Sequence, residues 1–252
     1  MLHDYGGDGQ PILLLHGLMG GSRTWRRHVR WLQHYGQVWA LDAAGHEPNQ
    51  TSGPWTTERF VADAAAAVQR IDDGPVVAIG HSMGGLHAWC LAAEYPQLVR
   101  AVVVEDMAPD FRGRTAGAWL AQFEQWPLPF ADDQQVLDFF GPVAGRYFLE
   151  SFVCRPDGWH LHGNMEHWLA IAEHWGTRAH WAQWAAVRVP ALLLEAEQSI
   201  TPRGQMVQMA AAAKAECTHL VVAGTGHLLH DDAPARYRGA VETFLSGLAP
   251  CS

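Results

Sequence analysis

The sequence has few basic residues, few cysteines and no long hydrophobic run, and each shortage excludes a class of protein. Its 252 residues include 17 Lys and Arg against 26 Asp and Glu, a formal net charge of −9. No basic run interrupts this acidic balance, so neither nucleic acid nor an anionic membrane surface is an expected partner. No apolar run approaches the roughly 20 residues that span a bilayer, so membrane insertion is not expected either.

The cysteines are scattered, and none of them forms a C-x-x-C pair. There are four: Cys90, Cys154, Cys217 and Cys251. Free thiols in a reducing compartment are the simplest account of this pattern. Met1 to Asp4 also contain no basic and apolar leader. We therefore expect a cytoplasmic protein, long enough for one α/β domain with a modest insertion.

Short runs of Val, Ile, Leu and Ala alternate with amphipathic segments along most of the chain. Apolar runs without alternation are typical of strands buried on both faces, and hence of parallel sheets. The predicted strands are Pro11 to Leu15, Val38 to Leu41, Val76 to Ile79, Ala101 to Val104, Ala191 to Leu194 and Leu220 to Val222. The predicted helices are Ser22 to His34, Thr57 to Ile71, Met83 to Glu94, Arg203 to Lys214 and Ala233 to Leu245. This alternation predicts an α/β fold with a doubly wound, mostly parallel sheet.

One long stretch departs from the alternation. From residue 108 to residue 187 no strand-like run occurs, while tryptophan and histidine accumulate. The strand pattern resumes at Val189-Pro190. We interpret residues 108–187 as a helical cap, inserted into a core domain that is made of residues 1–107 and 188–252.

A glycine-rich turn lies between a predicted buried strand and a predicted helix. It reads Gly80-His81-Ser82-Met83-Gly84-Gly85. A strand, a sharp turn and a helix in this order form a nucleophile elbow, which exposes a serine at a helix N-terminus. Glycines on both sides of the serine fit such a turn because side chains there would meet neighbouring backbone. The motif predicts Ser82 as a nucleophile.

A serine hydroxyl needs a base, an orienting acid and donors for an oxyanion. His227 follows the last predicted strand in Gly224-Thr225-Gly226-His227, which brings it to the same sheet edge as the elbow. We therefore predict His227 as the base and expect its neighbour His230 to cap or pack. The backbone N–H groups of Leu18, after the first strand, and Met83 are the predicted oxyanion donors.

These motifs together resemble the α/β-hydrolase superfamily, and they occur in the order found in that family. They are Leu15-His16-Gly17, Leu41-Asp42 with Gly45-His46, the segment from Gly80 to Gly85, and Gly224-Thr225-Gly226-His227. The resemblance spans nearly the whole chain outside the cap. His16 to Gly20, together with Asp106-Met107-Ala108-Pro109, is similar to a branch of small acyl esterases and thioesterases.

The resemblance leaves several positions open for the acid. Members of the family usually place it in a G-x-x-D-x-x-x-P loop after the penultimate strand, but here the aspartate position before Pro202 holds Gln198. Other members place the acid at the end of the strand that follows the elbow helix, where Asp106 stands. We predict Asp106 as the acid, with Glu105 as the first alternative and Glu197 as the second.

The cap is rich in aromatic residues that are suited to line an apolar pocket. Most of them are expected to pack the cap against the core, and we take as pocket candidates His16, Trp126, Trp159 and Trp168. His160, His162 and His167 have no fixed geometry, and the serine mechanism needs no metal. No metal site is therefore expected.

The resemblance implies hydrolysis of a carboxylic ester or thioester through an acyl-enzyme, without a cofactor. The substrate would be a small acyl ester or thioester, and the protein a monomer or homodimer. One alternative is a cofactor-free dioxygenase or a carbon–carbon bond hydrolase that acts on an aromatic-derived substrate. A second alternative is a non-catalytic relative that keeps the fold and binds a ligand.

Overall fold

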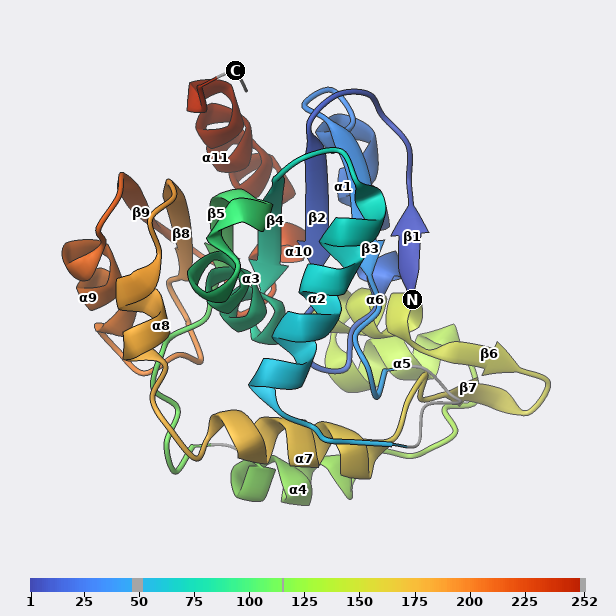
Figure 1. Ribbon diagram of the computed structural model, residues 1–252. Coiled ribbons are helices and arrows are strands. Elements are labelled where there is room, and N and C mark those ends of the chain that lie inside the picture. Colours follow the sequence, from blue (N-terminus) through green and yellow to red (C-terminus); the bar gives the residue numbers. More distant parts are fainter. Residues whose placement is uncertain (47–51, 115, 250–252) are drawn as a thin grey trace.

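The computed structural model describes residues 1–46, 52–114 and 116–249, so Cys251 lies outside the described residues. A seven-stranded sheet forms its centre (Figure 1). In spatial order the strands are β1 (Leu2–Asp4), β3 (Gln37–Leu41), β2 (Pro11–Leu15), β4 (Val76–His81), β5 (Val99–Glu105), β8 (Ala191–Ala196) and β9 (Cys217–Val222). All neighbouring pairs are parallel except β1 and β3. The predicted mostly parallel sheet is confirmed, with the unpredicted β1 added at its edge.

Helices cover both faces of this sheet. Successive strand residues point to opposite sides, and in the central strands the side chains on both sides are apolar. In β2, Leu13 and Leu15 pack with one set of helices, while Ile12 and Leu14 pack with the other. The first set is α2 (Thr57–Ile71), α3 (Met83–Glu94), α8 (Trp181–Ala186) and α9 (Gln205–Ala212). The second set is a 3-10 turn (Ser22–Trp25), α1 (Arg26–Leu32) and α11 (Pro234–Gly247). Two short helical turns complete the core, η2 (Pro96–Leu98) and α10 (Leu229–Asp232).

Helix boundaries follow local chemistry where the sequence provides a cap. The Thr56 side chain accepts a hydrogen bond from the Arg59 amide, and Asp72 ends α2 in a left-handed conformation at φ 51°. Both α2 and α3 have the predicted bounds. The predicted helix from Ser22 to His34 instead divides into a 3-10 turn and the shorter α1.

The inserted segment between β5 and β8 is helical, and it carries one short hairpin. Its elements before α8 are α4 (Ala116–Phe123), α5 (Asp133–Phe140), α6 (Pro142–Ser151), β6 (Val153–Arg155), β7 (Gly158–His160) and α7 (Met165–Trp175). The expectation of no strand in this stretch is wrong. Each strand of the hairpin has only three residues, and Cys154 and Arg155 are exposed, so the hairpin leaves no buried apolar run in the sequence.

The insertion has its own small core, and its last helix also contacts the sheet domain. Phe130, Val136, Phe148 and Phe152 pack together between α5, α6 and the hairpin. The last helix of the insertion, α8, lies against α3. Its Trp184 indole donates a hydrogen bond to the Met209 carbonyl of α9. In Figure 1, α4 and α7 run across the end of the molecule toward which β4 points.

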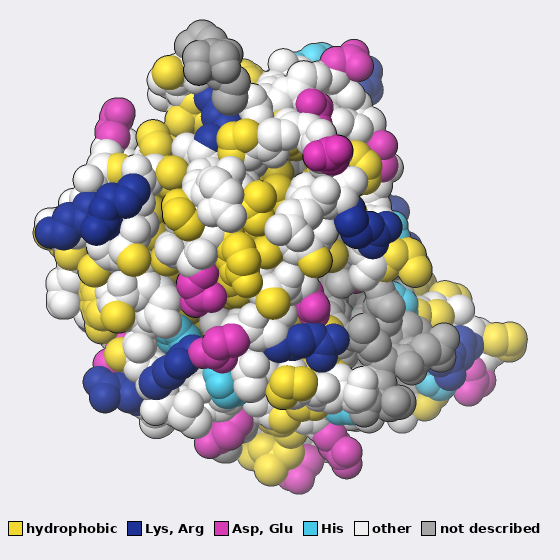
Figure 2. Space-filling view, in the orientation of Figure 1, with side chains coloured by type: hydrophobic (Ala, Val, Ile, Leu, Met, Phe, Trp, Pro, Cys, Tyr) yellow, Lys and Arg dark blue, Asp and Glu magenta, His cyan; other side chains and the backbone are white. Residues whose placement is uncertain are grey.

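The surface carries charges of both signs. On the face shown in Figure 2, Lys and Arg side chains are separated from one another by acidic, polar and apolar groups. No described helix is long and apolar enough to cross a membrane.

The turn between β4 and α3 is closely packed against neighbouring backbone. A Cβ added at Gly84 would lie 2.1 Å from the Leu15 carbonyl oxygen, and one added at Gly80 would lie 2.2 Å from the Gly84 oxygen. Both approaches are shorter than any real Cβ contact. Only glycine therefore allows β2, β4 and α3 to meet at this point.

We predict that Gly84→Ala lowers the free energy of unfolding by about 1–3 kcal/mol or more, because the backbone that it meets cannot rotate away. Urea unfolding monitored by circular dichroism measures this change. Gly239→Ala is the matched control, since no atom of the described residues beyond its own turn of α11 lies within 4 Å of the added Cβ. That control should gain about 0.5–1 kcal/mol. Equal stability of the two variants would contradict the role of crowding.

Candidate active site

Ser82 occupies the turn between β4 and α3 in a backbone conformation that is rare for a residue with a side chain. Its φ is 51° and its ψ is −121°. The Ser82 amide donates a hydrogen bond to the Glu105 carbonyl at 2.8 Å, which ties the turn to the end of β5. Strain of this kind persists where the surrounding structure imposes it, and it clusters at functional sites. The side chain is mostly buried and lines a pocket.

The two predicted oxyanion donors lie next to this turn. Met83 is the first residue of α3, so its N–H group has no partner within the helix. Leu18 follows β2 in a loop, and its side chain lines the same pocket as Ser82. Among the residues that the structure describes, the Leu18 amide donates no hydrogen bond to protein. Both N–H groups are thus available for a bound oxygen.

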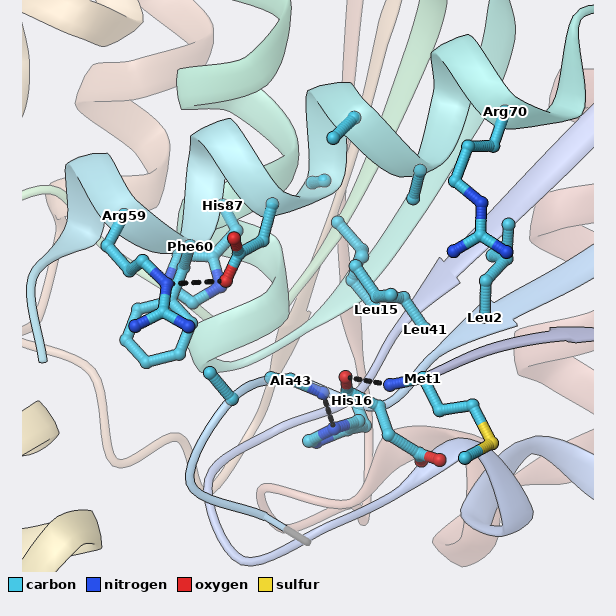
Figure 3. A pocket seen from close by; sticks show the side chains of 16 residues that line it. Met1, Leu2, Leu15, His16, Leu41, Ala43, Arg59, Phe60, Arg70 and His87 are labelled. Atoms are coloured by element: carbon cyan, nitrogen blue, oxygen red, sulfur yellow. Dashed lines mark hydrogen bonds and ion pairs between the residues drawn. The ribbon is translucent and has the colours of Figure 1, made fainter. Parts of the chain in front are cut away.

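Histidines hold the Leu18 loop in place. The His16 ring donates from Nδ1 to the Gly17 carbonyl at 2.8 Å. Its Nε2 accepts from the Ala43 amide at 3.0 Å (Figure 3). The His46 ring accepts from the Met19 amide at 3.2 Å. His16, which we expected in the substrate pocket, is not among the residues that line it. Its hydrogen bonds to Gly17 and Ala43 instead hold the loop that contains Leu18.

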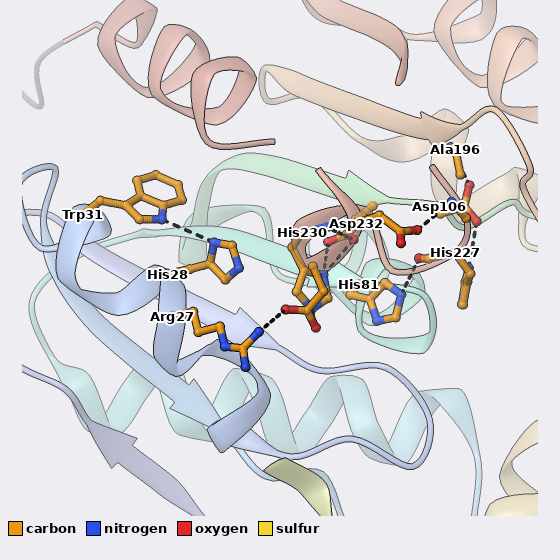
Figure 4. A network of polar contacts seen from close by, with 12 residues as sticks. Arg27, His28, Trp31, His81, Asp106, Ala196, His227, His230 and Asp232 are labelled. Carbon is orange, nitrogen blue, oxygen red and sulfur yellow. Dashed lines mark hydrogen bonds and ion pairs between the residues drawn. The ribbon is translucent and has the colours of Figure 1, made fainter. Parts of the chain in front are cut away.

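Asp106 and His227 are in direct contact. Asp106 directly follows β5 and is completely buried, and its Oδ2 accepts a hydrogen bond from His227 Nδ1 at 2.7 Å (Figure 4). Its other oxygen, Oδ1, accepts from the Ala196 amide at 2.9 Å. Because the carboxylate accepts a hydrogen bond from Nδ1–H, a neutral His227 ring has its free lone pair on Nε2, which can accept a proton. The arrangement supplies an oriented base.

His227 and Ser82 line the same pocket. Within the described residues no hydrogen bond joins the Ser82 hydroxyl to the His227 ring. Such contacts are often long in unliganded sites and shorten when substrate binds. The arrangement therefore has the parts of a nucleophile–base–acid system in one place.

The other two acid candidates have different partners. The Glu197 carboxylate accepts a hydrogen bond from the Gly224 amide at 2.7 Å and holds the start of the loop that carries His227. Glu105 is completely buried, and its Oε1 lies 2.7 Å from Nδ1 of His230. Gln198 occupies the usual position of the acid, and its backbone N–H donates a hydrogen bond to the Thr225 carbonyl. None of the three has a hydrogen bond to the His227 ring among the described residues.

The pocket beside Ser82 is mainly apolar and has a volume of about 260 Å³. Its walls come from the Leu18 loop, the insertion and the loops that follow β8 and β9. Apart from Ser82, His81 and His227, its lining consists of Leu18, Met19, Gln122, Phe123, Ala144, Tyr147, Phe148, Trp175, Ile200 and Leu228. An apolar cavity with a few convergent polar groups is typical of a small-molecule site.

The three tryptophans that we expected in this pocket lie elsewhere. Trp126 packs edge-on against Phe148 in the core of the insertion. Trp159 donates its indole N–H to Asp133 at 2.7 Å, and Trp168 is buried against the His46 ring. The aromatic content of the insertion thus stabilises mainly the insertion itself and its contact with the Leu18 loop.

Helical spacing could have identified part of the real lining. Ala144, Tyr147 and Phe148 are related as i, i+3 and i+4 on α6, which places them on one face. Ile200 and Leu228, in contrast, come from loops whose direction no periodic pattern encodes.

Buried histidines surround the site, and most of them are held neutral. Burial lowers the pKa of His28 and His87 to about 3 and that of His180 to about 4. The same cause lowers the pKa of His16, His46, His81 and His174. His230 differs from these. Burial alone would lower its pKa, but attraction to Glu105 and their hydrogen bond raise it above the ordinary value.

Among the described residues, no group of three or more His, Cys, Asp and Glu side chains is arranged to hold a metal ion. The histidines of the cap contact other partners. His160 meets Asp157 at 2.9 Å, and the His167 ring packs against Trp55.

A mostly parallel sheet with a strained serine in the turn between a strand and a helix is the architecture of α/β hydrolases. The chain belongs to the alpha/beta hydrolase family, whose family model matches residues 12–240. The match covers nearly all of the sheet domain and the complete insertion.

The chain is similar to curated relatives with different substrates. It is 26% identical over 250 residues to an (E)-2-((N-methylformamido)methylene)succinate hydrolase of Acinetobacter baylyi, covering 95% of this chain and 91% of that protein. It is 38% identical to lipase LipV of Mycobacterium tuberculosis over 105 residues, which are 41% of this chain and 40% of the lipase.

A solved structure of an E-2-(acetamidomethylene)succinate hydrolase superposes with a TM-score of 0.84 at 19% identity. The match covers 98% of this chain and 94% of that one. At this identity the likeness shows the fold.

We predict that acid unfolds this protein through its buried neutral histidines. A histidine with a lowered native pKa binds its proton more readily in the unfolded chain. For His87, with a native pKa of about 3, this costs about 1.4 kcal/mol of stability per pH unit between pH 6.5 and pH 3. His87 stacks on Phe60 at 5.0 Å and has no hydrogen bond within the described residues (Figure 3). His87→Phe should therefore reduce the stability lost between pH 6.5 and 4.5 by about 2–3 kcal/mol.

Urea unfolding at the two pH values measures this difference. His34→Gln, at an exposed position, is the control and should keep the wild-type pH dependence. An unchanged pH dependence in His87→Phe would show that this ring is not a source of acid lability.

Proposed function

We propose that this protein is a serine hydrolase that cleaves a carboxylic ester or thioester through an acyl-enzyme. The observation that carries the proposal is the 2.7 Å contact between Asp106 and His227, in a pocket that also contains Ser82. No structural role requires a buried carboxylate, an oriented imidazole and a strained serine at one sheet edge. Nucleophilic acyl transfer requires all three.

In the proposed reaction, the Ser82 hydroxyl attacks the acyl carbonyl while His227 Nε2 takes its proton. Asp106 keeps the Nδ1 proton in place and stabilises the imidazolium that forms. The amides of Leu18 and Met83 bind the oxyanion of the tetrahedral intermediate. The intermediate expels the alcohol or thiol, which receives the proton from His227. Water activated by His227 then attacks the acyl-enzyme and releases the acid.

The pocket limits the size of the acyl group. A volume of about 260 Å³ lies just below the range of roughly 300–1,000 Å³ that is typical of small-molecule sites. We therefore propose a short or medium acyl chain, or a single aromatic ring, as the group beside Ser82. Similarity to a lipase supports ester chemistry, whereas similarity to a succinate hydrolase supports small, functionalised substrates.

One observation favours a second candidate reaction. Phe123, Phe148 and Trp175 give the pocket an aromatic wall that suits a flat ring. A cofactor-free dioxygenase or carbon–carbon bond hydrolase acting on an aromatic-derived substrate would use the same base. Oxygen uptake with a quinolone-type substrate, compared with acid release from simple esters, separates the two reactions.

We predict that Asp106→Asn lowers kcat by up to about 10⁴-fold on p-nitrophenyl esters, because the amide stabilises the wrong ring tautomer. Ser82→Ala should abolish both turnover and labelling by a fluorophosphonate probe. Turnover of graded p-nitrophenyl esters and acyl thioesters is the measurement.

Glu197→Gln is the control for this series. Its side chain bonds to the Gly224 amide, and a glutamine oxygen can accept the same hydrogen bond, so kcat should change little. A crippled Glu197→Gln beside an active Asp106→Asn would assign the acid to Glu197. Wild-type protein that neither reacts with the probe nor turns over any ester would support a non-catalytic, ligand-binding relative.

We also predict that bulk added at Ala144 shortens the preferred acyl chain. The side chain lines the pocket from α6, so Ala144→Leu should lower kcat/KM for octanoyl esters by about 10–200-fold and leave acetyl esters nearly unchanged. Ala182→Leu adds the same bulk at an exposed position of α8 and should leave the chain-length profile unchanged. A parallel loss on all chain lengths would mean that the substitution disturbs the reacting groups and not the acyl pocket.

A further inference from the structure

A second carboxylate–imidazole pair lies beside the one that orients the proposed base. Glu105 Oε1 accepts hydrogen bonds from His230 Nδ1 at 2.7 Å and from the His230 amide at 3.1 Å. Glu105 is completely buried, and His230 is 1% exposed. Neither residue lines the pocket, so the proposed reaction does not use them directly.

The two pairs join the same two segments of the chain, the end of β5 and the turn at residues 227–230. Glu105 and Asp106 are consecutive at the end of β5, and His227 and His230 are three residues apart in one turn. Each acid binds one of the two histidines. The turn that carries the base is therefore attached to β5 at two points.

A third contact joins this turn to the nucleophile. The His81 ring, directly before Ser82, donates from Nε2 to the His227 carbonyl at 2.9 Å. His81 also packs edge-on against the His230 ring, with ring centroids 5.2 Å apart. The separation of Ser82 from His227 thus depends on how the 227–230 turn sits on β4 and β5.

The His230 ring has little freedom to move. It stacks on Trp25 at 4.9 Å and meets His28 and Tyr237 edge-on at 5.4 and 5.9 Å. Asp231 lies 3.7 Å from its Nε2 and is itself paired with Arg27. A displacement of His230 would therefore require repacking of α1 and α11, as well as loss of the contact with Glu105.

We propose that Glu105 and His230 are positioning residues that set the place of His227 relative to Ser82. The proposal rests on the proposed serine-hydrolase function and adds a role for a pair that does not touch substrate. Buried pairs of this kind are costly to desolvate and are weak evidence for a gain in stability. Their contribution to geometry is the more direct reading here, because misplacement of a reacting group by about 1 Å lowers rates about 10²-fold.

Two conservative variants separate length from charge at Glu105. Glu105→Gln keeps the reach of the side chain and an acceptor oxygen for both hydrogen bonds. Glu105→Asp keeps the charge but is one methylene shorter. A positioning role predicts that Glu105→Asp lowers kcat about 10²-fold with little change in KM, while Glu105→Gln stays within about tenfold of wild type.

The measurements are kcat and KM on a p-nitrophenyl ester and the rate of fluorophosphonate labelling, on protein whose fold is checked by circular dichroism. Glu195→Gln is the matched control, since Glu195 meets His219 at 2.7 Å between β8 and β9 and does not line the pocket. It should behave as wild type.

Three outcomes would overturn the inference. If both Glu105 variants stay within about threefold of wild type in kcat, the pair does not position the base. If Glu105→Gln loses activity and Glu105→Asp keeps it, the charge and not the geometry matters. If Glu195→Gln loses as much as Glu105→Asp, the effect is general to such pairs. A wild-type protein without esterase activity or labelling would instead refute the proposed function, and this inference with it.

Discussion

The hydrogen bond between Asp106 and His227 joins parts of the chain that lie 121 residues apart. It requires the end of β5, the end of β8 and the loop after β9 to meet at one place. Asp106 Oδ1 accepts a hydrogen bond from the Ala196 amide, in the neighbouring strand β8. The backbone amide of Asp106 donates one to the Leu194 carbonyl. A shift of one residue in the pairing of β5 and β8 would turn the carboxylate away from the loop. The register of the sheet is therefore also the geometry of the base.

The same sheet edge concentrates buried polar groups, whose desolvation opposes folding. Asp106 and Glu105 are fully buried, and each has a histidine and a backbone N–H as partners. His81 is less completely satisfied, because its Nδ1 has no hydrogen-bond partner among the described residues. Unsatisfied buried atoms destabilise a fold, and they persist where the position serves another purpose. Here the His81 ring lies next to the turn that carries Ser82 and donates a hydrogen bond to the His227 carbonyl.

The elements of the sheet domain could be predicted well, because buried parallel strands and capped helices leave patterns in the sequence. The bounds of α2 and α3 agree with the predicted ranges, and Ser82 was marked by its glycines. The strands of three residues, β1, β6 and β7, left no such pattern. His230 was expected to cap or pack, and its pairing with Glu105 was not foreseen, because the direction of two adjacent side chains at a strand end depends on tertiary contacts.

The pocket was the least predictable part, since aromatic residues serve the core of the insertion as readily as a ligand. Trp159 and Trp168 both find partners inside the protein, whereas Tyr147 and Phe148 reach the pocket from α6. Tyr147 also packs against His81 and His230, with ring centroids 6.1 and 6.2 Å apart.

The helix α6 is thus at once a wall of the proposed acyl pocket and a neighbour of the turn that carries His227, the proposed base. Size selection and base placement share one packed surface, because Tyr147 contributes to both. A substitution in α6 that widens the pocket toward this ring would also loosen the packing around the Glu105–His230 pair. Ala144 lies one turn away on the same helix and lines the pocket with a side chain of a single methyl group. Pocket size can therefore change at Ala144 while the base keeps its position.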